Sequence, residues 1–111
     1  MTEKEVSDFL ADISAEIENL QKFTNGLNFG QFRENTAVLY ACIRSLEIMG
    51  EAAKKVDVQF KKRNPQVPWK SMIGMRDILI HGYFKVSTEV VWKTIKEDIP
   101  GLKEKMRSLD K

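Results

Sequence analysis

Near the amino terminus, apolar residues recur at three- and four-residue steps, which is the spacing of one helix face. Thr2 and Glu5 precede this stripe at the spacing of a capping box. Thr24-Asn25-Gly26 then interrupts it, and Asn28 and Gly30 extend the break. We therefore predict a first amphipathic helix followed by a loop. The stripe consists of Val6, Phe9, Leu10, Ile13, Ile17 and Leu20.

A second and longest helix is predicted from about Glu34 to Phe60, because apolar residues cover well over half of its circumference. A helix of this kind needs more than one neighbouring helix to bury its surface. The apolar positions are Val38, Leu39, Ala41, Cys42, Ile43, Leu46, Ile48, Met49, Ala52, Ala53 and Val56.

The remaining strip of this helix carries polar residues and allows two interpretations. In the first, it is a solvated face with weak ion pairs, each worth about 0.2–0.5 kcal/mol. In the second, Glu47 or Glu51 neutralises Arg76 from across a helix interface, because a buried arginine is tolerated mainly when it is paired. The strip consists of Tyr40, Arg44, Glu47, Glu51 and Lys54.

Two further helices are predicted in the second half of the chain. Prolines 65 and 68 end the long helix and prepare a third one, which runs from Pro68 towards Tyr83. Ser87 or Thr88 caps a fourth, whose stripe is interrupted by a kink near Pro100. Neither strand alternation nor an internal repeat is visible. The predicted fold is therefore all-α, an up-and-down bundle of four main helices with short connections.

Composition restricts the class of protein. A chain of 111 residues with 42% hydrophobic and 31% charged residues is expected to form one soluble domain, spanning residues 1–111. No apolar run is long enough for a membrane helix and the amino terminus is highly charged, so we expect a cytoplasmic protein. The single cysteine, Cys42, excludes an internal disulfide and is interpreted as a core residue.

Motifs of several enzyme classes are missing. There is no Walker loop, no Gly-x-Gly-x-x-Gly, no His-Glu-x-x-His and no carboxylate cluster at metal spacing. We accordingly expect neither a cofactor nor a metal. The net charge of +2 permits a local basic surface without requiring one. Lys61-Lys62-Arg63 is a basic run that is either simply solvated or in contact with phosphate groups.

The third predicted helix holds the residues with the clearest chemistry. It contains the only histidine of the chain, His81, and places Arg76 near the middle of a broad apolar arc. Tyr83 lies within about 20° of Arg76, and Asp77 neighbours His81 one turn away. Arg76 and His81 are about 140° apart on an ideal helix, so they share a site only in a cleft or where the helix loosens near Gly82.

The spacing of Arg76, His81 and Tyr83 matches the Arg-x4-His-x-Tyr signature of HEPN-fold ribonuclease toxins of the HepT type. The flanking segments are similar too, so the chain resembles this family over most of its length. The flanking segments are Pro68-Trp69-Lys70, Met75, Val90-Val91-Trp92 and the stretch from Arg44 to Lys55.

The resemblance implies a HEPN-like domain that acts as a metal-independent endoribonuclease and toxin. RNA cleavage needs a base for the 2′-hydroxyl, an acid for the leaving 5′-oxygen and a cation for the phosphorane. His81 suits acid and base catalysis, and Arg76 suits the phosphate. One histidine does not readily do both, whereas a two-fold homodimer supplies two copies of each residue to one cleft. Known HEPN ribonucleases are dimers of this sort.

The resemblance also implies a partner and a modification. HepT toxins pair with a minimal nucleotidyltransferase antitoxin of the MntA type, which transfers AMP to the tyrosine corresponding to Tyr83. An AMP group on Tyr83 would add bulk and negative charge, which would pair with the Arg76 guanidinium and exclude RNA from the site. The family more often has asparagine at the position of Asp77. Here the carboxylate either orients the imidazole of His81 or is simply an exposed helix residue.

Three other interpretations have a structural or non-catalytic basis. In the first, His81 is a helix-end histidine bonded to a carbonyl, and Tyr83 packs its ring on the apolar face. Alternatively, the chain is a non-catalytic nucleotide-binding adaptor that forms a complex with a nucleotidyltransferase. In the third, it is a helical interaction module whose Arg76 anchors a dimer interface.

Overall fold

The computed structural model describes residues 1–82 and 87–109, and within these ranges all regular structure is helical. The all-α prediction is therefore confirmed. In chain order the helices are α1 (Glu3–Thr24), α2 (Phe29–Glu34), α3 (Thr36–Lys55), α4 (Val58–Arg63), α5 (Trp69–His81), α6 (Thr88–Lys93), the π-helical segment η2 (Thr94–Asp98) and α7 (Ile99–Arg107).

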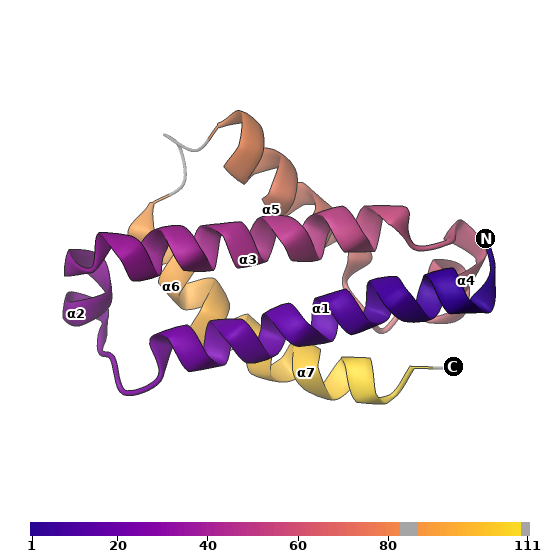
Figure 1. Cartoon of the computed structure of the whole chain (residues 1–111), viewed down its shortest axis with the longest axis horizontal. Coiled ribbons are helices and arrows are strands. Elements are labelled where there is room, and N and C mark those ends of the chain that lie inside the picture. Colours follow the sequence, from indigo (N-terminus) through magenta and orange to yellow (C-terminus); the bar gives the residue numbers. More distant parts are fainter. Residues whose placement is uncertain (83–86, 110–111) are drawn as a thin grey trace.

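Helix α3 is the central element of the bundle. It lies beside α1 along most of its length, and α5 packs on its other side (Figure 1). Helix α7 contacts α1 and completes the bundle of four main helices that the sequence predicts. The carboxyl end of α5 projects away from the other helices in this view, which leaves the Arg76–His81 segment at the edge of the bundle.

The core is formed by the stripes predicted for the first, second and last helices. Each stripe turns towards the centre of the bundle, where apolar side chains are removed from water at about 25 cal/mol per Å². Cys42 is fully buried among them, as predicted. The most deeply buried members include Ile13, Ile17, Leu20, Phe32, Cys42, Ala53, Leu79, Val91, Ile95 and Ile99.

The second helix is shorter than predicted. It ends at Lys55, because Val56 adopts an extended conformation with ψ 138° and Asp57 begins a separate helix, α4. The Asp57 carboxylate accepts a hydrogen bond from the Gln59 amide at 3.0 Å and so caps α4. Phe60 therefore belongs to α4 and packs edge-on against Trp69 with ring centroids 6.3 Å apart.

The last helix is irregular where the sequence predicts a kink. The Ile99 amide donates to the Thr94 carbonyl, a five-residue step that makes the segment π-helical. Pro100 follows immediately and has no amide hydrogen to donate to the preceding turn. Ser87 caps the start of α6 by accepting from the Val90 amide at 3.1 Å, which confirms one of the two predicted caps.

Candidate active site

Helix α5 carries the predicted site residues and is anchored at its first turn. The indole nitrogen of Trp69 donates to the Asn64 carbonyl at 3.0 Å, and the Trp69 ring contacts Phe60 of α4. Met72 and Leu79, seven residues apart, are buried on the same side of α5. These contacts fix the rotation of α5 about its axis and thereby the direction in which Arg76 points.

Arg76 lies over the backbone of α3 at Gly50. A Cβ atom at residue 50 would meet the Arg76 Cβ at 2.2 Å and the Met72 carbonyl oxygen at 2.7 Å. Only a residue without a side chain permits so close an approach of the two helices. The Arg76 side chain is 22% exposed, so its stem is enclosed while part of its guanidinium reaches the surface.

The guanidinium of Arg76 is incompletely paired. Its NH1 group donates to the Asp77 carboxylate at 3.0 Å. Its Nε atom is buried and has no hydrogen-bond partner within the described residues. A buried donor without a partner costs roughly 1–3 kcal/mol. Because NH1 already binds Asp77 and Nε is buried, an anion can use this spare donor only if the Arg76 side chain shifts.

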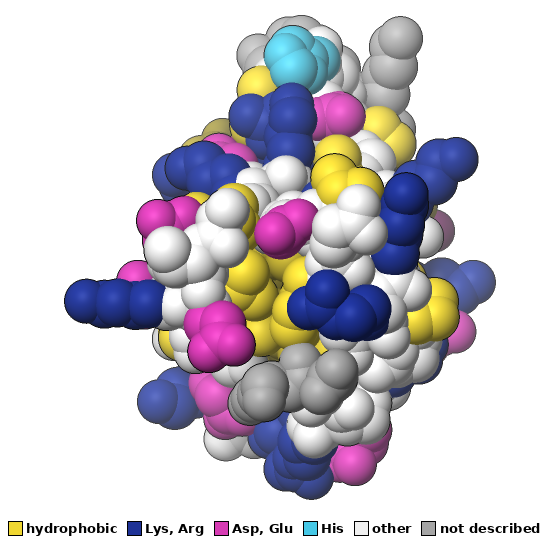
Figure 2. Space-filling model, turned by 90° about the vertical axis from the view of Figure 1, so that its right-hand side faces the viewer, with side chains coloured by type: hydrophobic (Ala, Val, Ile, Leu, Met, Phe, Trp, Pro, Cys, Tyr) yellow, Lys and Arg dark blue, Asp and Glu magenta, His cyan; other side chains and the backbone are white. Residues whose placement is uncertain are grey.

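His81 is exposed at the last turn of α5, and its Nδ1 lies 3.2 Å from the main-chain carbonyl oxygen of Asp77. Because a carbonyl only accepts, Nδ1 carries the hydrogen of this bond. In the neutral imidazole the lone pair then sits on Nε2. The helix-end arrangement considered from the sequence is thus present, and it leaves Nε2 as a potential base. Figure 2 shows the imidazole, in cyan, at one extremity of the molecule.

Asp77 does not orient His81 through its carboxylate, as one interpretation of the sequence had it. The carboxylate binds Arg76 because the guanidinium is adjacent and carries a full charge, which favours a charge-assisted bond. The main-chain carbonyl of Asp77 holds the imidazole instead. Asp77 thus contacts both side chains, while no direct contact between Arg76 and His81 occurs in the described part of the chain.

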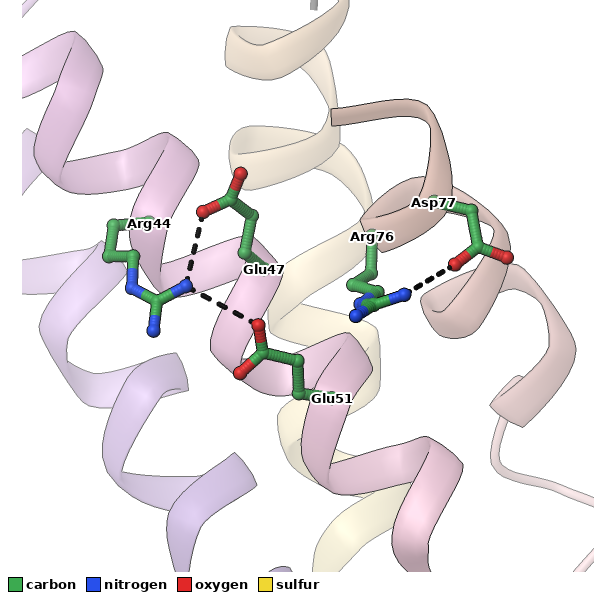
Figure 3. Close-up of polar contacts among 5 residues, drawn as sticks. All are labelled: Arg44, Glu47, Glu51, Arg76 and Asp77. Carbon is green, nitrogen blue, oxygen red and sulfur yellow. Dashed lines mark hydrogen bonds and ion pairs between the residues drawn. The ribbon is translucent and has the colours of Figure 1, made fainter. Parts of the chain in front are cut away.

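Glu47 and Glu51 do not pair with Arg76, and this prediction is wrong. Both carboxylates bind the NH1 group of Arg44, at 3.3 and 3.4 Å (Figure 3). The reason is that Arg44 lies on the same face of α3 one and two turns away, whereas Arg76 is held by Asp77. The hydrogen bond that Arg44 donates to the Glu47 carboxylate raises the pKa of Arg44. The strip is therefore the solvated, ion-paired face of the first interpretation.

The Asp77 carboxylate lies on the guanidinium of Arg76 (Figure 3). It opposes the approach of a polyanion unless it is displaced or a second subunit adds cations. Tyr83, the predicted modification site, lies outside the described residues.

A cavity of about 430 Å³ opens between α3, α5 and α7, and neither Arg76 nor His81 lines it. Within the described residues, the two motif residues therefore lie outside this cavity, on the part of α5 at the edge of the bundle. The lining of this cavity is mostly apolar and includes Leu46, Met49, Met72, Met75, Ile99 and Leu102.

Residues 1–82 and 87–109 contain neither a metal-binding cluster nor a membrane-spanning helix. No group of three or more histidine, cysteine or acidic side chains is arranged to hold a metal ion. Likewise, these residues form no helix with the length and apolarity required to span a bilayer.

Residues 13–109 match the family described as "Ribonuclease HepT-like". The chain belongs to this family. A Thermococcus cleftensis protein named "Probable ribonuclease HepT" is 47% identical to this HepT-like chain over 104 residues, which are 94% of each sequence. "Putative RNase MJ1380" of Methanocaldococcus jannaschii is 40% identical over 106 residues, covering 96% of this chain and 97% of the relative. No solved structure gave a significant match.

The family resemblance drawn from the motif and its flanks is thus confirmed for this HepT-like chain. Sequence reasoning missed Gly50 as the contact point beneath Arg76. A glycine in the middle of a long helix is unfavourable by about 0.5–1 kcal/mol relative to alanine, and this was the signal for a close helix approach. It also missed that Asp77 would hold both motif side chains, since that depends on rotamers.

Proposed function

We propose that this HepT-like protein is a metal-independent endoribonuclease, with Arg76 and His81 of α5 as its catalytic residues. The observation that carries the proposal is the pair of unused groups at the edge of α5, in a chain of this family. The Arg76 guanidinium keeps an unpaired donor. The imidazole of His81 is exposed and held through Nδ1, so that Nε2 faces outward from this bond.

The proposed reaction is an internal transesterification. Nε2 of His81 accepts the proton of the 2′-hydroxyl, and the 2′-oxygen forms a bond to phosphorus. The bond from phosphorus to the 5′-oxygen breaks, and the His81 of a second subunit donates a proton to that oxygen. Arg76 stabilises the charge on the phosphorane. The products are a 2′,3′-cyclic phosphate and a 5′-hydroxyl end.

A homodimer is part of this proposal. Within the described residues of one chain, Arg76 and His81 make no contact with each other, and the chain has one histidine for two proton transfers. A two-fold axis next to α5 would present two Arg76 and two His81 residues to the same phosphate. It would also offset the negative charge of Asp77 beside Arg76.

We further propose that the protein is the toxin of a toxin–antitoxin pair and is silenced at Tyr83. The tyrosine oxygen attacks the α-phosphorus of ATP held by a minimal nucleotidyltransferase of the MntA type. The bond to pyrophosphate breaks, AMP stays on Tyr83 and the phenolic proton passes to solvent. The added phosphate brings negative charge towards the Arg76 guanidinium and so opposes the binding of RNA. Co-expression with such an antitoxin should add multiples of AMP to the intact mass, and Tyr83→Phe should abolish this increase.

Cleavage of labelled RNA by the purified protein in EDTA tests the ribonuclease proposal. Arg76→Ala and His81→Ala should each lower the rate by about 10²–10³. Arg107→Ala, which removes an exposed arginine paired with Glu104 on α7, is the matched control and should cleave at the parental rate. Parental cleavage by both motif variants would refute the mechanism. Tight ATP binding without any RNA cleavage would instead establish the nucleotide-binding adaptor.

A further inference from the structure

Six of the eighteen basic residues of the chain lie between Glu51 and Arg76, in the last turn of α3, in α4 and in the first turn of α5. The same interval contains a single acidic residue, Asp57, whose carboxylate caps α4. The chain as a whole has a net charge of only +2, so positive charge is concentrated in this part. We call these six residues the basic surface: Lys54, Lys55, Lys61, Lys62, Arg63 and Lys70.

The helices that carry the basic surface are fixed to one another. Lys61 of α4 donates through Nζ to the Lys54 carbonyl at the end of α3, at 3.3 Å. Phe60 of α4 packs on Trp69 of α5, and Trp69 binds the Asn64 carbonyl in the connecting segment. The cations are therefore displayed on a preformed platform rather than on a free loop.

Most members of the basic surface are exposed, and none of them forms an ion pair within the described residues. Elsewhere several cations are neutralised, such as Arg44 by two glutamates and Lys103 by Glu18 at 2.9 Å. Figure 1 places α4 at one end of the molecule, from which the chain runs back to the start of α5, and Figure 2 looks onto that end. Unpaired cations on a rigid surface attract phosphate groups, because binding releases the counterions of the nucleic acid.

The basic surface continues along α5 to the proposed catalytic histidine. Lys70, Asp77 and His81 are separated by seven and four residues, so all three point within about 20–40° of one another. All three are exposed. At a rise of about 1.5 Å per residue, Lys70 lies roughly 16 Å from His81 along the helix axis. A strand of several nucleotides can therefore span from the catalytic edge to the platform of α4.

We infer that the basic surface is the RNA-binding platform of this protein, holding the phosphates of single-stranded RNA to one side of the cleaved bond. This inference rests on the proposed ribonuclease function for its substrate, but it concerns binding and not the chemical step. Affinity for RNA then comes mainly from α4 and the start of α5, whereas Arg76 and His81 act on one phosphate.

The test is the binding of a fluorescent single-stranded RNA that carries 2′-O-methyl groups and therefore cannot be cleaved. The variant Lys62→Glu/Lys70→Glu changes two exposed members of the basic surface. The control Lys22→Glu/Arg33→Glu makes the same change of charge at the end of α1 and in α2, at the opposite end of the bundle (Figure 1). Thermal unfolding of both variants verifies that they fold.

The basic-surface variant should bind the RNA at least about tenfold more weakly than the parent. The slope of its log Kd against the logarithm of the salt concentration should decrease by roughly 0.7 for each phosphate contact removed. The control should stay within about twofold of the parent. A dinucleotide, which is too short to reach the platform, should bind both variants alike. Parental RNA affinity of the basic-surface variant, or an equal loss in the control, would overturn the inference.

Cleavage assays separate this inference from the proposed function. If Arg76→Ala and His81→Ala abolish cleavage but the basic-surface variant binds RNA like the parent, the platform is refuted and the nuclease stands. If the parent binds RNA through the basic surface and never cleaves it, the platform stands and the nuclease is refuted.

Discussion

At the scale of a single residue, Asp77 limits the access of an anion to the Arg76 guanidinium. Its carboxylate accepts a hydrogen bond from NH1 of Arg76 at 3.0 Å (Figure 3). A phosphate must compete with it for the same guanidinium. The main-chain carbonyl that holds His81 does not depend on the side chain. The carboxylate is therefore dispensable for orienting the imidazole and opposes the binding of substrate.

We predict that Asp77→Asn raises the rate of RNA cleavage about fivefold, equivalent to about 1 kcal/mol. The amide keeps the size of the side chain but removes the charge that competes with phosphate. Stability should change by less than about 1 kcal/mol, because the Asp77 side chain is 50% exposed. Glu104→Gln, which breaks the exposed ion pair with Arg107, is the control and should leave cleavage unchanged. A slower Asp77→Asn enzyme would show that the carboxylate takes part in catalysis.

Cys42 is a buried residue whose ionisation affects stability at high pH. Burial raises the pKa of its thiol from 9.0 to about 11, and the nearby Lys96 opposes this only in part. The unfolded chain therefore loses the proton first as the pH rises, so the free energy of unfolding falls between pH 9 and pH 11. Below pH 9 the thiol is protonated in both states and contributes no pH dependence.

Between pH 9 and pH 11, the free energy of unfolding of the parent should therefore fall by roughly 1–3 kcal/mol more than that of Cys42→Ala. Denaturant unfolding of both proteins across this interval measures the difference. Comparing slopes removes the contribution of lysines and tyrosines, which both proteins share. Identical slopes would mean that the folded thiol ionises as readily as the unfolded one.

At the scale of the helices, the sequence predicted most of the fold because each stripe depends only on local spacing. Even the kink before Pro100 follows from a missing amide hydrogen. The break after Lys55 was missed because apolar residues continue across it to Phe60, although Asp57 is a common capping residue.

The partners of Arg76 were less predictable. Whether Glu47 and Glu51 reach Arg76 or Arg44 depends on the rotation of α3 relative to α5, and helical spacing within either helix does not determine that rotation. Gly50 at the crossing and the anchoring of Trp69 set it in three dimensions.

The crossing of α3 and α5 gives a prediction at the same scale. Gly50→Ala places a methyl group where the Arg76 Cβ and the Met72 carbonyl already lie, so α5 must move away from α3. We expect a loss of about 1–3 kcal/mol in the free energy of unfolding, as for other overpacked sites. Because Arg76 itself is displaced, RNA cleavage by the folded variant should fall at least about tenfold.

Gly74→Ala is the matched control for this prediction. Residue 74 lies on the same helix as Arg76, and a Cβ atom there meets nothing within 4 Å. The substitution should preserve cleavage and stabilise the helix by about 0.5–1 kcal/mol. A Gly50→Ala protein that unfolds and cleaves like the parent would mean that α5 does not require the close approach.

At the scale of the whole molecule, the main question is how an open edge becomes a site. In one chain Arg76 packs on α3 while His81 lies at the tip of α5, and among the described residues Asp77 contacts both of them. A two-fold partner would bring a second copy of this edge to the same phosphate. The arginine and histidine that act together then need not come from the same chain.

Mixing two inactive variants tests this arrangement. Arg76→Ala and His81→Ala proteins, unfolded together and refolded, should form mixed dimers that hold one arginine and one histidine from different chains. The mixed dimer keeps one histidine, which can act as the base while water protonates the leaving 5′-oxygen less effectively. We therefore expect RNA cleavage to return to more than about tenfold above either variant alone, though well below the parent. Each variant refolded separately is the control. If the mixture is as inactive as its components while native mass spectra show mixed dimers, one arginine and one histidine from different chains are not sufficient for cleavage.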